Sequence, residues 1–89
     1  MTIQMLLLLL SMKMEISEER VKEILSRELQ VDIEKINENT SQESISEWDS
    51  LNHLKIISEL EKEFGFKFTI REITDSVSFS NIMNIIKSK

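Results

Sequence analysis

The sequence has no cysteine and no proline, and among its 89 residues there are only one glycine and one histidine. Without cysteine no disulfide can stabilise the fold, and nothing indicates an oxidising compartment. A single histidine leaves only carboxylates as metal ligands, and the aspartate–asparagine–glycine loop of calcium sites is absent from the sequence. With 40% apolar and only 6% aromatic residues, the composition favours a compact helical domain over a disordered chain or a β-sandwich.

The sequence also lacks the basic excess that nucleic-acid binding requires. It contains 11 lysine and arginine residues against 16 acids, which gives a net charge of −5. Neutralising phosphates requires clustered lysine and arginine, so we expect no nucleic-acid partner. An acidic protein of this size is suited to basic surfaces on partner proteins, and its length predicts one small domain.

The first 14 residues differ in composition from the rest. The apolar run "MLLLLL" at residues 5–10 is far shorter than the ~20 residues of a membrane-spanning helix, so we expect no span. A secretory signal would need a basic segment before this run and a cleavage site after it, and neither is clear. We interpret residues 1–14 as an N-terminal extension outside the fold and 15–89 as the domain; the alternative is a short apolar helix that packs on the domain or binds a partner.

Apolar residues at helical spacing predict helices at about 17–29 and 50–64, a short one near 70–75, and a fourth from residue 79. Gly65 follows the second helix, where a left-handed terminus favours glycine. Ser78 is placed to cap the fourth helix. The fold class is therefore all-α, a small four-helix bundle with a long loop between helices 1 and 2 and a short helix 3.

The predicted connection between the first two helices, residues 30–48, is unusually long for a domain of this size. Such loops are often functional. We expect four apolar side chains to hold the loop against the core: Val31, Ile33, Ile36 and Ile45.

At the start of the second helix, Asp49 and Ser50 allow two interpretations. Either residue could simply cap the helix by accepting from its free N–H groups. Ser50 could instead be a covalent attachment point, because a phosphate ester there would lie near those N–H groups and the positive end of the helix dipole. The two roles are compatible. A catalytic serine is excluded by the lack of a suitable base and oxyanion hole, and His53, the only imidazole, is expected on the helix surface.

The stretch "DSLNHLKIISELEKEFGFKF", residues 49–68, resembles the phosphopantetheine attachment region of acyl carrier proteins and of the related carrier domains of polyketide, peptide and D-alanyl transfer systems. The resemblance covers roughly residues 15–89. It implies an acyl-carrier-protein-like fold, no catalytic residue, and a 4′-phosphopantetheine arm attached to Ser50 between Asp49 and Leu51. It also implies a cytoplasmic monomer that meets a phosphopantetheinyl transferase and the enzymes that load and transfer acyl groups.

The resemblance has one departure: family members commonly have a very acidic second helix, whereas here Asn52, Lys55 and Lys62 interrupt the acids. We therefore expect docking to basic partners to be weaker or differently aimed. Partner contacts are predicted for Glu47, Trp48, Leu54, Glu59, Glu61 and Glu63, although Trp48 could pack against the loop and Leu54 in the core. Candidates to line an acyl-chain cavity are Leu60, Phe64, Phe68, Ile73 and Ile82, for which plain core packing is the alternative.

The predicted function is an acyl carrier in a fatty-acid, polyketide, or specialised lipid or polysaccharide pathway. Two alternatives remain open from the sequence. One is an aminoacyl or peptidyl carrier, including a D-alanyl carrier, with the same arm and a different cargo. The other is a helical binding module that is never modified.

Overall fold

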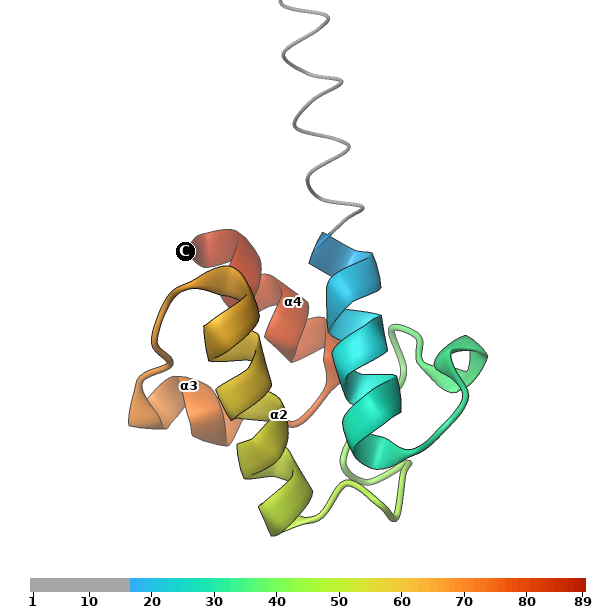
Figure 1. The fold of residues 1–89 in the computed structure, drawn as a ribbon. Coiled ribbons are helices and arrows are strands. Elements are labelled where there is room, and N and C mark those ends of the chain that lie inside the picture. Colours follow the sequence, from blue (N-terminus) through green and yellow to red (C-terminus); the bar gives the residue numbers. More distant parts are fainter. Residues whose placement is uncertain (1–16) are drawn as a thin grey trace, which may run out of the picture.

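The computed structural model describes residues 17–89, so the predicted extension over residues 1–14 lies outside the described part of the chain. Residues 17–29 are helical. Four further elements follow: η1 (Ile33–Lys35), α2 (Ser50–Phe64), α3 (Ile70–Asp75) and α4 (Phe79–Ser88). In the described residues there is no strand, which confirms the predicted all-α class, and the helix bounds agree with those expected. Figure 1 shows α2 between the helix of residues 17–29 on one side and the short α3 on the other.

One hydrophobic core joins the helices. Each long helix contributes the apolar residues that recur every three or four positions, so that they share one face. The side chains of Trp48 and Ile36 enter the same core from the long loop, and Phe68 enters it from the segment before α3. The other buried members are Val21, Ile24, Leu25, Leu29, Ile56, Ile57, Leu60, Phe79, Ile82 and Met83.

Both ends of α2 are set by local chemistry. At its start the Asp49 carboxylate accepts from the Asn52 N–H at 2.8 Å. At its end Gly65 has φ 72° and ψ 25°, and its N–H donates to the Glu61 carbonyl at 2.9 Å. This is the left-handed terminus that the sequence predicts, where a residue with a Cβ would be strained. The register of α2, and with it the position of Ser50, is therefore fixed from both ends.

Side-chain caps also define the two C-terminal helices. Thr69 accepts from the Glu72 N–H while the Glu72 carboxylate accepts from the Thr69 N–H, a reciprocal capping box at the start of α3. Lys89 donates to Glu72 at 2.8 Å, and this bond, with the one from Thr69, lowers the pKa of the Glu72 carboxyl despite its partial desolvation. Ser78 accepts from the Asn81 N–H and caps α4, as predicted.

The long loop is held to the rest of the domain at several points. Ile36 is buried, and Val31 and Ile45 pack against the core, as expected. The prediction for Ile33 was wrong: Ile33 lies in η1, a single 3₁₀ turn that buries none of its residues. Two backbone bonds also tie the loop to the α3–α4 connection and to the start of α4: the Gln42 N–H donates to the Val77 carbonyl at 2.8 Å, and the Phe79 N–H donates to the Thr40 carbonyl at 2.9 Å.

Candidate functional site

Ser50 is the first residue of α2, and its side chain is exposed. The preceding residue, Asp49, provides the cap. Within residues 17–89 nothing hydrogen-bonds to the Ser50 hydroxyl. Asp49 is therefore the helix cap, and the Ser50 hydroxyl remains accessible.

The surroundings of this hydroxyl suit a phosphate ester. The N–H groups of Ser50 and Leu51 lie in the first turn and have no intrahelical acceptor, while the next two N–H groups are bonded to Asp49. Because α2 is 15 residues long, its N-terminus carries the partial positive charge of a full helix dipole, which stabilises an anion. The Asn52 side chain donates to the Glu47 carbonyl at 2.7 Å and fixes the chain just before the site. Ser50 is thus presented on a rigid support.

Trp48 and His53, which lie two residues before and three residues after Ser50, form a buried polar contact. Their exposed fractions are 2% and 8%, and Trp48 Nε1 donates to His53 Nδ1 at 3.0 Å. Because Nδ1 accepts, Nε2 carries the hydrogen and donates to the Ile73 carbonyl at 2.8 Å. His53 thereby links the segment before Ser50, α2 and α3.

The predictions that His53 lies on the surface and that Trp48 contacts partners were therefore wrong. His53 precedes Ile56, Ile57 and Leu60 by three, four and seven residues, so it belongs to the buried face of α2. The sequence shows this spacing, and His53 can follow it into the core because both of its ring nitrogens are hydrogen-bonded. For Trp48 the alternative, a ring packed beneath the loop, is the one that the structure has.

Leu51 and Leu54 lie on the outer face of α2. Their exposed fractions are 64% and 58%, so Leu51 lies exposed beside Ser50 and the alternative of a core role for Leu54 is wrong. Lys55, Ser58 and Lys62 are exposed on the same face. Glu47 is also exposed, just before the helix.

The three acids predicted to meet partners from the second half of α2 are engaged within the domain. Arg27 lies 3.6 Å from Glu59, and Arg20 lies 3.2 Å from Glu63, so both acids face the helix of residues 17–29. Glu61 accepts from the Phe68 N–H at 2.9 Å and lies 3.8 Å from Lys67. These acids stand on the flanks of α2 rather than on its outer face.

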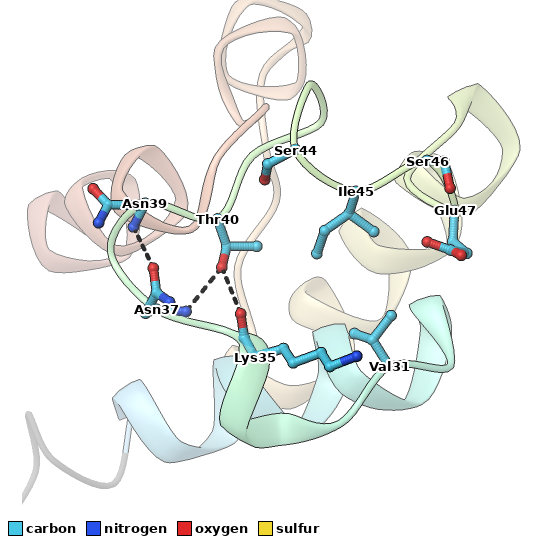
Figure 2. Close-up of a pocket in the computed structure, with 9 residues that line it drawn as sticks. All are labelled: Val31, Lys35, Asn37, Asn39, Thr40, Ser44, Ile45, Ser46 and Glu47. Carbon is cyan, nitrogen blue, oxygen red and sulfur yellow. Dashed lines mark hydrogen bonds between the residues drawn. The ribbon is translucent and has the colours of Figure 1, made fainter.

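The five candidates for an acyl-chain cavity belong to the core or lie against it. Leu60, Phe68 and Ile82 are buried, and Phe64 and Ile73 pack on them with partial exposure. None of the five lines the pocket of about 480 Å³ in Figure 2, which is lined by residues of the long loop. The residues around that pocket are Val31, Lys35, Asn37, Asn39, Thr40, Ser44, Ile45, Ser46 and Glu47. All five side chains take part in the packing of the core, and their contact with an acyl chain stays a prediction.

Within residues 17–89 no group of three or more histidine, cysteine or acidic side chains is arranged to hold a metal ion. None of the helices in the same range is long and apolar enough to cross a bilayer.

The family model of the phosphopantetheine attachment site matches residues 19–86. The chain belongs to the carrier protein family. Among solved structures it is similar to one from Mycobacterium tuberculosis described as "a putative acyl carrier protein" (Rv0033), with a TM-score of 0.72 and 24% sequence identity over 80% of this chain and 95% of that one. No curated protein matches the sequence.

Membership in this family identifies the chain as a carrier protein with a covalently attached 4′-phosphopantetheine. The fold of the carrier is the acyl-carrier-protein fold. A carrier domain interacts with the phosphopantetheinyl transferase that modifies it and with the enzymes it serves. Proteins of this family are generally not catalytic themselves.

Proposed function

We propose that this carrier protein is an acyl carrier protein modified at Ser50. When bound, the prosthetic arm supplies a thiol that holds an acyl group as a thioester. The observation that carries the proposal is the exposed Ser50 hydroxyl at the first residue of α2, left accessible because Asp49 provides the helix cap. An acyl cargo is supported by the description of the similar Mycobacterium tuberculosis protein.

The attachment step uses only the Ser50 hydroxyl from this chain. Its oxygen forms a bond to the phosphorus of the phosphopantetheine portion of coenzyme A, and the bond from that phosphorus to the nucleotide oxygen breaks. The nucleotide leaves, and the hydroxyl proton passes to a base of the transferase. The N–H groups of Ser50 and Leu51 at the start of α2 would then help to stabilise the charge of the phosphodiester.

Asp49 and Leu51 have different roles in this proposal. Asp49 holds the first turn through its bond to the Asn52 N–H and so fixes the backbone that carries Ser50. Leu51 is largely exposed and offers an apolar contact to an enzyme that approaches Ser50. Glu47 is exposed three residues before Ser50 and is a candidate contact for the same enzyme.

The test is the intact mass after incubation with coenzyme A and a broad-specificity phosphopantetheinyl transferase. Wild type is compared with Ser50→Ala and with Ser88→Ala, a control because Ser88 is an exposed serine at the end of α4, outside the site. We expect one phosphopantetheinyl group on the wild type and on Ser88→Ala, and none on Ser50→Ala. Circular dichroism checks that each variant keeps its helices.

Two results would overturn the proposal. A mass gain in Ser50→Ala would move the attachment to another residue. No gain in the wild type with several transferases would favour the unmodified binding module. If Ser50 is modified, loading assays with acyl-activating and aminoacyl-activating enzymes then identify the cargo, and acceptance of amino acids alone would replace acyl carrier by aminoacyl carrier.

A further inference from the structure

The outer face of α2 forms a continuous exposed strip that begins one residue after Ser50. Leu51 and Leu54 come first, and the side chain of Lys62 at the far end is 73% exposed. These positions recur every three or four residues, so they share one side of the helix, opposite the buried face. The strip, hereafter the cationic ridge, consists of Leu51, Leu54, Lys55, Ser58 and Lys62.

The charge of the cationic ridge is opposite to that of the chain. The sequence has a net charge of −5, yet the ridge holds two lysines and no acid. Lys55 forms no ion pair with any residue from 17 to 89. Lys62 lies 3.5 Å from Glu59, but an ion pair this exposed is weak and leaves the ammonium accessible.

Glu59 offsets part of the charge of Lys62, but the acids of α2 lie on its flanks, where neighbouring segments also bind them. Glu59 and Glu63 turn toward Arg27 and Arg20 of the helix of residues 17–29, which stands along one side of α2 in Figure 1. Glu61 turns toward the segment before α3, where the Phe68 N–H donates to it. The large side chains that project from the cationic ridge are therefore those of leucine and lysine.

The apolar part of the ridge lies where an enzyme acting at Ser50 must approach. Two largely exposed leucines within four residues of Ser50 are suited to a depression on a partner, since the centres of protein interfaces are apolar with a charged rim. Lys55 and Lys62, which follow these leucines along the helix, give the rim on the carrier a positive charge. A basic surface placed along Lys55 and Lys62 would be repelled and an acidic one attracted, whereas the exposed acids Glu47 and Asp49 precede Ser50 and lie outside the ridge.

We infer that the cationic ridge docks an enzyme with an acidic contact surface around an apolar depression, beginning with the phosphopantetheinyl transferase that modifies Ser50. The inference rests on the proposed function, because it concerns the partner of the same site. It differs from a carrier with an acidic second helix in the sign of the charge that the partner must present.

The test measures KM for each phosphopantetheinyl transferase of the source organism, with the carrier as varied substrate. Wild type is compared with Lys55→Glu/Lys62→Glu and with the matched control Lys35→Glu/Lys87→Glu. The control makes the same change in net charge at two exposed lysines outside the ridge, one in η1 and one in the last turn of α4. A second ridge variant, Lys55→Gln/Lys62→Gln, removes the charges without reversing them.

We expect KM of the reversed ridge variant to rise about tenfold or more at low ionic strength for the transferase that modifies the wild type. The neutral ridge variant should show a smaller rise and the control about twofold or less. The difference should shrink as salt is added, because the Debye length falls to about 10 Å at 0.1 M.

The outcomes separate the two proposals. Modification of the wild type with KM unchanged or lowered in the reversed ridge variant would overturn the inference alone, because the transferase then ignores the ridge or meets it with a basic surface. An equal rise in the matched control would also overturn it, because only net charge would then matter. No modification of the wild type by any of the transferases would overturn the proposed function and this inference together.

Discussion

The two faces of α2 show how one helix serves both the fold and the function. The inner face carries His53, Ile56, Ile57 and Leu60 and is buried against the other helices. The outer face is the cationic ridge. Residues of the two faces alternate along the same 15 residues, so every contact that fixes the inner face also fixes where Ser50 and the ridge point.

Each face contains a residue type that a simple rule of burial would assign to the other. The inner face holds His53, which is buried but has both ring nitrogens hydrogen-bonded. The outer face holds Leu51 and Leu54, which are exposed. A satisfied buried polar group and a pair of exposed leucines are both informative, because the first indicates a specific internal contact and the second an external one.

The largest expected effect on the free energy of unfolding comes from truncating a buried side chain on the inner face. Leu60→Ala removes a fully buried side chain and leaves a cavity, and the expected loss in free energy of unfolding is about 2–5 kcal/mol. The matched change on the outer face, Leu54→Ala, should stay within about 0.5 kcal/mol. Urea unfolding followed by circular dichroism and by the fluorescence of Trp48 measures both.

A large loss in Leu54→Ala would contradict the comparison. It would mean that Leu54 is covered in solution, for example by a second copy of the chain. Sedimentation of the wild type and of Leu54→Ala over a range of concentrations would distinguish that case, since a dimer would dissociate in the variant. The expected result is a monomer in both.

The next largest effect concerns the polar contact on the inner face. Trp48→Phe keeps an aromatic ring in the core but leaves His53 Nδ1 without a donor. Leaving a buried acceptor unpaired costs about 1–3 kcal/mol of unfolding free energy. The effect is measured by urea unfolding with circular dichroism, because the variant lacks the tryptophan. In the wild type, slow hydrogen exchange of the Trp48 indole N–H is the independent check, and fast exchange would show that the bond is absent in solution.

Local features of this chain could be predicted from the sequence. The start of α2 after Asp49, its end at Gly65 and the cap at Ser78 each depend on a few adjacent residues with a definite preference. The helical stripes likewise follow from spacing alone. The exposure of Ser50, the proposed attachment residue, belongs to this class, because the position of a first helical residue after its cap is a local feature.

Contacts between distant residues could not be predicted in the same way. The bond from His53 to Ile73 spans 20 positions, and Trp48 is buried because that segment closes over the core. The direction of the acids of α2 depends on Arg20 and Arg27 of another helix. The sequence alone does not place those arginines, so it predicts Glu59 and Glu63 as partner contacts. Only the packed helices show that Lys55 and Lys62 occupy the outer face of α2.

The smallest expected effect on stability comes from the acids on the flank of α2, between its inner and outer faces. Glu59→Gln/Glu63→Gln removes both carboxylates that face Arg27 and Arg20. Because these ion pairs are partly exposed, the loss in unfolding free energy should be at most about 1 kcal/mol for each and should decrease with added salt. If the flank acids only hold the first helix, the variant should leave KM for the phosphopantetheinyl transferase within about twofold of wild type. A much larger rise in KM would show that these carboxylates contact the enzyme, and the docking surface would then extend from the ridge onto the flank of α2.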